Sequence, residues 1–346
     1  MPGYPCSSAK GLRSTRVLMS AAIAAAFLAV AGSAQAASYT FQTLNNPGDL
    51  NFNQLLGINN AGTIAGYFGD GTVVPNNGYT LIPPSAYNAE NVLNSTQTQV
   101  IGINNPGPNA ATVGFFTNPA GNTFGFVNQG GNVTPVSDPL TPITGTATNN
   151  LLGVNDHGIA AGFYNDISGN AHGYVYNITT TVFTPVTPTF AATAVTATGI
   201  NNAGLISGFY TDAAGNFHGF LDNNGTFTSL DDPNGSMTML LGLNNADQVV
   251  GSFVAPSGIT EGLIYNLATN TWQTISDPNA SANPAFNVTG TTVNGINDLG
   301  QLVGFYSDGT HVNGFLATPV PEPATLGLLL PAAVGLIARR RRAKQA

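Results

Sequence analysis

The amino-acid sequence predicts an all-β fold, namely a six-bladed β-propeller of four-stranded antiparallel blades that is closed by its N-terminal strand. Three observations support this prediction. A motif of the form Gly-(Ile/Val/Leu)-Asn-(Asn/Asp) recurs six times at intervals of 43 to 53 residues, a period typical of propeller blades. Each copy is followed by alternating apolar residues and glycine-rich turns, the pattern of short strands. The body begins with a segment that matches the end of a repeat unit.

The six copies are GINNAGTIAGYF from Gly57, GINNPGPNAATVGFF from Gly102, GVNDHGIAAGFY from Gly153, GINNAGLISGFY from Gly199, GLNNADQVVGSF from Gly242 and GINDLGQLVGFY from Gly295. In each unit we expect the first strand to end at the Ile-Asn pair or its equivalent. A tight turn then leads to a second strand with alternating apolar residues, such as Ile206 and Tyr210. A turn such as 212–216 precedes a third strand such as 217–221, and a fourth strand such as GTFTSLDDPN from Gly225 completes the blade.

The phase of the repeat predicts how the ring closes. YTFQTLNNPG from Tyr39 matches a fourth strand, and the last unit stops after its third strand near Leu316. We therefore expect the N-terminal strand to complete the last blade and so protect the sheet edges. The segment from Tyr79 to Thr98 has no clear fourth strand and contains Pro83 and Pro84, so the repeat is weakest there.

One asparagine stands at the same place in every unit: Asn59, Asn104, Asn155, Asn201, Asn244 and Asn297. A residue required equally in six blades is more often a turn cap, whose amide bonds to nearby backbone groups, than a ligand contact. We therefore predict a structural role for all six. The glycine three residues later, as in Gly62, is expected at positive φ, with Asp247 replacing it in the fifth unit.

The distribution of charge excludes several functions. All eight lysines and arginines lie in the two terminal segments, and of the 16 acidic residues only Glu322 lies outside Tyr39 to Ala317, which leaves 16 − 1 = 15 carboxylates there. Nucleic-acid binding is excluded because contacts to a phosphate backbone need cationic side chains. Catalysis directed at phosphates or carboxylates is disfavoured for the same reason, unless a metal supplies the charge. A hydrophobic content of 42% with 7% charged residues argues against disorder.

No residue pattern predicts a catalytic or zinc site. His172 and His218 share one repeat position, no close histidine pair occurs, and Cys6 is the only cysteine. The Asp-x-x-Gly-Asn turns offer oxygen ligands for calcium, but they lack the ligand count and the closing glutamate of a known calcium loop. We therefore predict no cofactor, with calcium as the alternative. No Gly-x-Ser-x-Gly motif is present, and the nonrepeating acids Glu90 and Glu261 are weak candidates for carboxylate catalysis.

The N-terminal segment predicts export. Three cations, at Lys10, Arg13 and Arg16, precede an apolar stretch over 17–31, and a small-x-small cleavage site follows at Ala34 and Ala36. We expect residues 1–36 to be a signal peptide, residues 37–318 the repeat domain, and residues 319–346 a sorting segment.

The C-terminal segment combines three features in a fixed order. The motif Val320, Pro321, Glu322 and Pro323 precedes an apolar run over 324–338 and the basic block Arg339, Arg340, Arg341 and Arg342. The apolar run would form a helix of about 22 Å against a bilayer core of about 30 Å, which suggests a transient inner-membrane anchor. The arginines after it should stay on the cytoplasmic side, so the body lies outside the inner membrane.

This tail resembles the C-terminal sorting signal of bacterial PEP-CTERM proteins. The resemblance implies that an exosortase-type membrane transpeptidase reads Pro321, Glu322 and Pro323, removes the tail, and releases or transfers the rest to the cell surface or the extracellular space. The body resembles bacterial extracellular proteins with HAF-type repeats, through its six motif copies and the downstream x-Gly-(Phe/Tyr) element. It departs from the name-giving motif, because its units read His172-Gly173-Tyr174 and His218-Gly219-Phe220. This second resemblance implies a repeat architecture outside the cell and no established activity.

Three functions remain open. The leading one is a secreted, non-enzymatic surface or matrix protein whose propeller serves structure or adhesion. The second is a module that binds extracellular polysaccharide, with Tyr67, Tyr164, Tyr210 and Tyr306 lining one end of the ring, although packing is the simpler role for these tyrosines. The third is a calcium-assisted hydrolase or lyase. Nonrepeating polar residues gathered at one end of the ring favour the second or third function, whereas a uniformly repeated surface favours the first.

Overall fold

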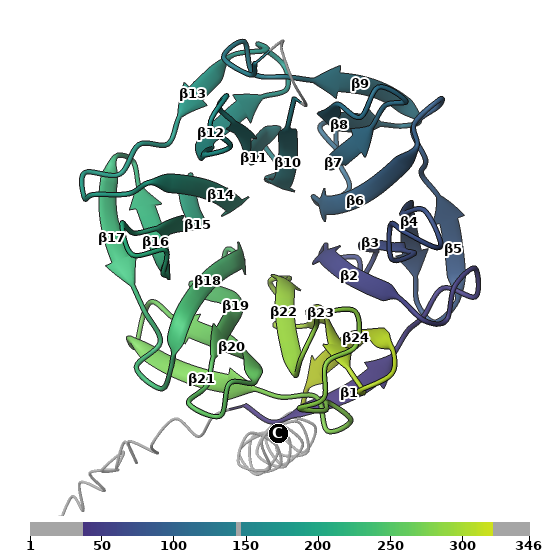
Figure 1. Ribbon diagram of the computed structural model, residues 1–346, viewed down its shortest axis with the longest axis vertical. Helices are drawn as coiled ribbons and strands as arrows, with labels where there is room; N and C mark the ends of the chain where they lie inside the picture. The colour runs from purple at the N-terminus through teal and green to yellow at the C-terminus, as the bar shows by residue number, and fades with distance from the viewer. Residues whose placement is uncertain (1–36, 143–146, 321–346) are drawn as a thin grey trace, which may run out of the picture. The chain divides into compact units, whose positions relative to one another are not determined.

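A computed structural model describes residues 37–142 and 147–320 of the chain, and these residues form 24 strands and no helix. The strands make six four-stranded antiparallel sheets arranged in a ring (Figure 1). The predicted six-bladed β-propeller is therefore confirmed. Among the described residues no helix is long and apolar enough to cross a membrane.

The blades follow one another along the chain. Blade 1 contains β2 (Asn53–Ile58), β3 (Ile64–Phe68), β4 (Asn77–Ile82) and β5 (Ala86–Ala89), and blade 2 contains β6 (Gln97–Ile103), β7 (Thr112–Thr117), β8 (Thr123–Gln129) and β9 (Asn132–Val136). Blade 3 contains β10 (Asn149–Val154), β11 (Ile159–Asn165), β12 (Ala171–Asn177) and β13 (Phe183–Pro185). Blade 4 contains β14 (Ala194–Ile200), β15 (Leu205–Thr211), β16 (Phe217–Asn223) and β17 (Thr226–Leu230), and blade 5 contains β18 (Ser236–Leu243), β19 (Gln248–Val254), β20 (Thr260–Asn266) and β21 (Thr271–Ile275). Blade 6 contains β22 (Thr291–Ile296), β23 (Leu302–Ser307), β24 (Val312–Pro319) and β1 (Tyr39–Thr43).

The N-terminal strand closes the ring as predicted. β1 pairs antiparallel with β24, with Phe41 opposite Ala317, and so supplies the fourth strand of blade 6. β24 runs to Pro319, and the backbone nitrogen of Val320 donates to the carbonyl oxygen of Ser38 at 2.8 Å. The last strand is therefore longer than the repeat alone indicated, and Val320 is the final described residue. The predicted cleavage site at 34–36, the motif at 321–323 and the arginines at 339–342 lie outside the described residues.

The segment between Tyr79 and Thr98 does contain a fourth strand, contrary to the expectation from the sequence. β5 pairs with β4, with Leu81 opposite Tyr87. Its four residues are mostly exposed, as are those of β9 and β17, which the sequence did identify. β5 reads AYNA and lacks the threonines that recur in NVTPV and TFTSL, so the repeat pattern of the fourth strand missed it.

The motif glycine allows neighbouring blades to approach closely. Every innermost strand has a register shift at this glycine, for example between Leu55 and Gly57. A Cβ on Gly57 would lie 2.7 Å from the carbonyl oxygen of Ile101 in the next blade, and one on Gly153 would lie 2.7 Å from that of Thr198. Because these neighbours are backbone atoms that cannot rotate away, only glycine fits at this position.

The core lies between the blades and not within one of them. Along each strand, alternate side chains face the preceding and the following blade. For example, Leu151 and Tyr174 of blade 3 pack with Val113 and Val127 of blade 2, and all four are almost fully buried. Each blade thus buries both of its faces against its neighbours.

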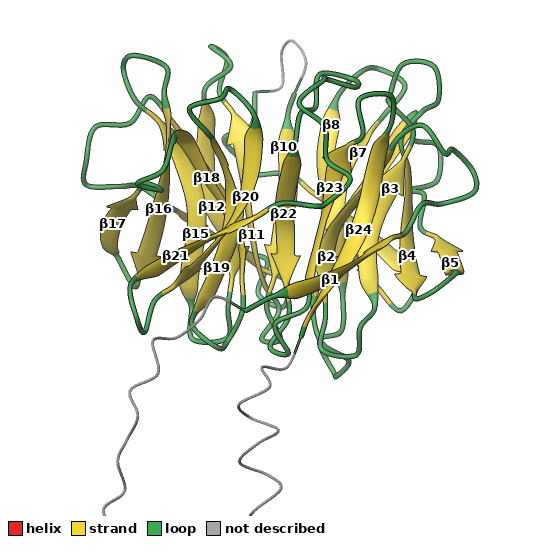
Figure 2. Cartoon of the chain, turned by 90° about the horizontal axis from the view of Figure 1, so that it is seen from below, coloured by secondary structure: helices red, strands yellow, loops and turns green. Residues whose placement is uncertain are grey.

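The ring has two ends of different character (Figure 2). We call the end with the turns between first and second strands the repeat end, because the six motif asparagines lie there. The opposite end, which we call the loop end, carries the turns between second and third strands and the connections between blades. These connections differ in length and sequence from one blade to the next.

Candidate functional site

At the repeat end, each motif asparagine caps its own turn and also bonds to the next blade. The side-chain oxygen of Asn59 accepts hydrogen bonds from the backbone nitrogens of Ala61 and Thr63, both at 3.0 Å, and its Nδ2 donates to the carbonyl oxygen of Asn104 at 3.1 Å. The remaining Nδ2-to-carbonyl bonds run from Asn104 to Asn155, Asn155 to Asn201, Asn201 to Asn244, Asn244 to Asn297 and Asn297 to Asn59. The six asparagines therefore form a closed ring whose contacts are structural.

The residue after each asparagine forms a second ring that the sequence did not suggest. Each backbone nitrogen donates to the side-chain oxygen of the next blade, in the order Asn60, Asn105, Asp156, Asn202, Asn245, Asp298 and back to Asn60. Asp156 Oδ2 also accepts from Asn105 at 3.0 Å and from Asn202 at 2.7 Å. Burial acts to raise the pKa of Asp156, but these hydrogen bonds outweigh it and the pKa is lowered. The rings enclose only about 60 Å³, which is too little for a sugar.

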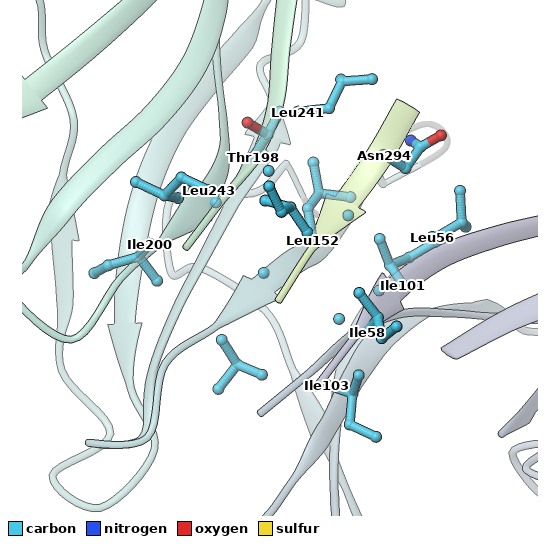
Figure 3. A pocket seen from close by; sticks show the side chains of 18 of the residues that line it. Leu56, Ile58, Ile101, Ile103, Leu152, Thr198, Ile200, Leu241, Leu243 and Asn294 are labelled. Carbon is cyan, nitrogen blue, oxygen red and sulfur yellow. The ribbon is translucent and has the colours of Figure 1, made fainter. Parts of the chain in front are cut away.

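The central channel holds a cavity of about 350 Å³ with mainly aliphatic walls (Figure 3). Its labelled side chains include Leu56, Ile58, Ile101, Ile103, Leu152, Ile200, Leu241 and Leu243. Thr198 and Asn294 are the polar exceptions among these positions. Thr198 Oγ1 already lies 2.8 Å from the carbonyl oxygen of Leu240 and 3.0 Å from that of Ser207. Because the described residues lining this cavity include no titratable side chain, they offer no group for acid–base chemistry.

The loop end carries a second cavity of about 380 Å³, which we call the His172 cleft. Its walls come from blade 3, from the connections that enter and leave this blade, and from the start of β14 in blade 4. The lining residues used below are Asp138, Tyr164, His172, Tyr174, Thr187 and Phe190. The cleft therefore combines one carboxylate, one imidazole and several aromatic rings.

Tyr164 and His172 form a stacked pair at this cleft, with ring centroids 5.1 Å apart and planes inclined by 20°. They are directly opposite each other on β11 and β12. His172 Nε2 lies 3.0 Å from Asp166 Oδ2, which fixes the orientation of the imidazole. Asp166 Oδ1 accepts from the backbone nitrogens of Ser168 and Asn170. The hydrogen bond from His172 is the first cause that lowers the pKa of Asp166.

The carboxylates considered above as calcium ligands thus serve the turns that contain them. Asp212 repeats the arrangement in blade 4, where Oδ1 accepts from the nitrogens of Ala214 and Asn216. Among the described residues, no group of three or more His, Cys, Asp or Glu side chains is placed to hold a metal ion.

Asp138 supplies a carboxylate deep in the cleft. It is 7% exposed, and its Oδ1 accepts from the backbone nitrogen of Leu140 at 2.8 Å. Tyr174 lies nearby, and its hydroxyl donates to Asn149 Oδ1. Burial first, and then the charge of Asp138, raise the pKa of Tyr174. Within the described part of the chain, Asp138 Oδ2 accepts no hydrogen bond, and Asp138 lines the cleft.

At the cleft, blade 3 lacks a cross-strand contact that is present in blades 1, 4 and 6. In blade 4 the equivalent histidine, His218, is held by Asp231 at 2.8 Å and by Asp212 at 3.3 Å. In blades 1 and 6 the equivalent residues, Asn77 and Asn313, accept from Asn91 and Asn45. Val186 bonds to Gly173 in blade 3, and Leu230 pairs with Gly219 in blade 4, so Val186 and Leu230 are equivalent. The next residue is therefore Thr187 in blade 3 and Asp231 in blade 4. No hydrogen bond joins Thr187 and His172, and the space between them forms part of the cleft.

The four tyrosines that the carbohydrate-binding alternative placed at one end of the ring do not act together. Tyr164 is opposite Asn149, the first residue of its inner strand, whereas Tyr67 is opposite Gln54, the second. Because side chains alternate along a strand, Tyr67 faces the other side of its blade. Tyr210 and Tyr306 are 8% and 4% exposed and belong to the core clusters. Packing is therefore the role of three of them, and only Tyr164 lines the cleft.

The two nonrepeating acids also lie apart from the cleft. Glu90 accepts from Thr80 and Thr112 hydroxyls at 3.1 and 2.6 Å and from Asn128 at 3.0 Å, and so joins blades 1 and 2. Glu261 lies on β20, opposite Phe253. Their positions supply no pair of carboxylates at one site.

Comparison with known proteins places the fold. No protein-family model matches the chain, and no curated protein matches it. The SapL1 lectin in complex with alpha methyl fucoside is similar in structure, with a TM-score of 0.51 and 10% identity over 78% of this chain and 96% of that chain. A variant of the Aleuria aurantia lectin in complex with Fucalpha1-6GlcNAc has a TM-score of 0.50 and 10% identity over 79% of this chain and 97% of that chain. At this identity the similarity shows the fold alone.

Proposed function

We propose that this protein is an exported, non-enzymatic carbohydrate-binding protein, and that the His172 cleft holds a neutral sugar unit of an extracellular polysaccharide. One observation carries the proposal. At the loop end, Thr187 stands where blade 4 has the aspartate that holds the equivalent histidine. The stacked pair Tyr164 and His172, which blade 4 repeats in Tyr210 and His218, there lines a cavity of about 380 Å³ together with the carboxylate of Asp138. The repeat end, by contrast, is uniform.

The chemistry of the cleft suits a sugar. A pyranose presents C–H groups on its faces and hydroxyls around its edge. Aromatic rings such as Tyr164 and Phe190 pack against the apolar face, while Asp138 Oδ2 accepts a hydroxyl proton in a charge-assisted hydrogen bond. A few polar groups placed among apolar walls are the usual construction of a small-ligand site.

The charge of the repeat domain selects neutral glycans. The sequence contains no lysine or arginine between Val17 and Ala338, so an acidic sugar would find no permanent cation. Asp138 and the other carboxylates would repel a uronic acid or a sulfate. The similarity to two lectins solved with fucose-containing ligands makes methyl α-L-fucoside, a neutral deoxy sugar, the first ligand to test.

The terminal segments support a location outside the cell. The signal-like N-terminus and the motif Pro321, Glu322 and Pro323 are consistent with export, transient anchoring and processing by an exosortase-type transpeptidase. A polysaccharide ligand is compatible with that location.

An array of immobilised neutral and acidic glycans, including α-fucosides, tests the function. We expect the wild type to bind one class of neutral glycan and His172→Ala to lose that binding by roughly tenfold or more, equivalent to about 1.4 kcal/mol. His218→Ala, which removes the equivalent residue of blade 4, is the matched control and should bind as the wild type does. Absence of binding to every neutral glycan, or equal losses in both variants, would contradict the proposal.

A further inference from the structure

A third cavity, of about 650 Å³, lies along the junction between blades 3 and 4. Val175 and Thr184 line it from blade 3, and Ile206, Asp222 and Phe227 line it from blade 4. Its lining reaches Ala203, in the turn at the repeat end. We call this cavity the junction groove. It extends from the outer strand of blade 3 to the repeat end, whereas the His172 cleft lies at the loop end.

The short outer strand of blade 3 explains why this junction is open. β13 has three residues, whereas β5 has four and β1, β9, β17 and β21 have five each. After β13 the chain leaves the blade, and Phe190 packs against Tyr210 of blade 4, with ring centroids 4.4 Å apart. An outer strand that ends early covers less of the side of its blade, and the junction groove lies beside this strand. Figure 1 shows β13 at the rim between blades 3 and 4.

The junction groove and the His172 cleft adjoin each other. Pro185, Val186 and Thr187 line both cavities, so the two cavities meet at this segment. A ligand that extends over this segment reaches from one cavity into the other. A single sugar needs only the His172 cleft and does not extend into the junction groove.

The junction groove has the same mixture of groups as the cleft. Phe227 offers a half-buried ring, and the hydroxyls of Thr184 and Thr189 are exposed. Asp222 Oδ1 accepts from the nitrogen of Gly225 at 2.6 Å and thereby fixes the carboxylate in the wall. Aromatic and hydroxyl groups with no lysine or arginine again favour a neutral, hydroxyl-rich chain.

We propose that the ligand is an internal stretch of a neutral polysaccharide, with one unit in the His172 cleft and the following units crossing Pro185–Thr187 into the junction groove. This inference rests on the proposed function and deepens it, because it assigns recognition to the polymer and not to a terminal sugar. Affinity should then rise with chain length until both cavities are filled.

A blocking substitution in the junction groove tests the inference. Ala203 is exposed in the blade 4 turn, and Ala246 is its exposed counterpart in blade 5. Their backbone nitrogens donate to Asn201 and Asn244 at 3.1 and 3.0 Å, bonds that a new side chain leaves intact. Ala203→Trp therefore adds a large side chain to the lining of the groove, and Ala246→Trp adds the same side chain to a surface outside it.

Isothermal titration measures the effect. The ligands are methyl α-L-fucoside, laminarin fragments from disaccharide to octasaccharide, and a size series from a neutral fucose-containing polysaccharide. In the series that binds, we expect the octasaccharide to bind roughly tenfold more tightly than the smallest ligand that binds. Ala203→Trp should remove that gain without changing the affinity of the smallest ligand, and Ala246→Trp should change neither.

The outcomes distinguish a failure of this inference from a failure of the proposed function. Equal affinity for short and long ligands, or equal behaviour of the two tryptophan variants, overturns the inference while the sugar site stands. Failure of the wild type to bind any member of these series overturns the proposed function itself.

Discussion

Asn297 Nδ2 donates to the carbonyl oxygen of Asn59 at 3.0 Å, although the two residues are 238 positions apart in the sequence. This bond closes the asparagine ring between the last blade and the first. The β1–β24 pairing closes blade 6 separately, at the outer rim. The propeller is thus closed both at its centre and at its edge.

Asn297→Ala should therefore destabilise the whole ring. Asn297 is 3% exposed, and its side-chain oxygen caps the nitrogens of Leu299 and Gln301. Removing its amide leaves the Leu299 and Gln301 nitrogens without their acceptor and breaks the bond to the Asn59 carbonyl oxygen, which keeps only the Gly62 nitrogen as donor. We expect a cost of about 1–3 kcal/mol. Urea unfolding measures the loss. Leu299→Ala, in the same turn and 64% exposed, should change the free energy of unfolding little, and an equally small effect of Asn297→Ala would refute the structural role.

Gly153→Ala should destabilise the fold by overpacking. The added Cβ would lie 2.7 Å from the carbonyl oxygen of Thr198 and 3.0 Å from the Cα of Gly199. Because both are backbone atoms of the next blade, blades 3 and 4 must separate, at a cost of about 1–3 kcal/mol. Gly107→Ala is the control, since a Cβ there meets nothing within 4 Å. Thermal unfolding of the two variants should show a lower midpoint for Gly153→Ala only.

The stability contributed by His218 should depend on pH. Hydrogen bonding to Asp231 is the first cause that raises the pKa of His218, and Asp212 raises it further. A raised pKa means that the contribution is complete below the unfolded-state pKa near 6.5 and is lost as the pH rises through the folded-state value. Hydrogen bonds, first from the backbone nitrogen of Asn216, lower the pKa of Asp212 to about 2. The stability that Asp212 contributes is therefore lost only below about pH 4.

Wild type and His218→Asn should accordingly differ more in free energy of unfolding at pH 5 than at pH 8.5. The difference should stay below about 1 kcal/mol, because the ion pairs are partly exposed. Denaturant unfolding at both pH values checks this, and the pH effect should shrink in Asp231→Asn. A larger difference at pH 8.5 than at pH 5 is the opposite result and would exclude the assigned contacts.

Replacing Pro321, Glu322 and Pro323 by alanine should block processing of the tail. We expect the wild type to be recovered outside the cell without residues beyond the motif, and the variant to remain in the membrane fraction with its arginines. Cell fractionation and intact mass give the answer. Retention of the basic tail by both proteins would make the tail a permanent anchor.

The sequence predicted the blades because their signals are local. Turn glycines such as Gly62 and Gly204 do have positive φ, as does Asp247 in the fifth unit. Ring closure by β1 was predictable from the phase of the repeat. The bonds from one asparagine to the next blade were not predictable, because they join residues more than 40 positions apart whose proximity depends on the whole ring.

The candidate site depended on small departures from the repeat. The sequence does show Val-Thr-Pro at 186–188 where blade 4 has Leu-Asp-Asp at 230–232, but the consequence for His172 follows only from the strand register. Packing, the simpler role expected for Tyr67, agrees with its burial, but the carbohydrate-binding alternative grouped Tyr67 with Tyr164 although a signal separated them. Tyr67 directly follows Gly66, the glycine within the second strand, whereas Tyr164 is the second residue after the equivalent Gly162. Counting from the glycine would have put the two tyrosines on opposite faces.

The most direct test of sugar binding in the His172 cleft is a titration of wild type, Asp138→Asn and Asp277→Asn with the neutral glycan that the array selects. Asparagine keeps the turn contact at both positions, because Asp138 Oδ1 accepts from Leu140 and Asp277 Oδ1 from Asn279, each at 2.8 Å. Loss of the carboxylate that accepts a ligand hydroxyl should weaken binding by roughly tenfold or more in Asp138→Asn, equivalent to about 1.5–3 kcal/mol for a hydrogen bond to a charged group. Asp277→Asn should retain the affinity of the wild type. Unchanged binding in Asp138→Asn, or an equal loss in both variants, would contradict the assignment of the cleft as the sugar site.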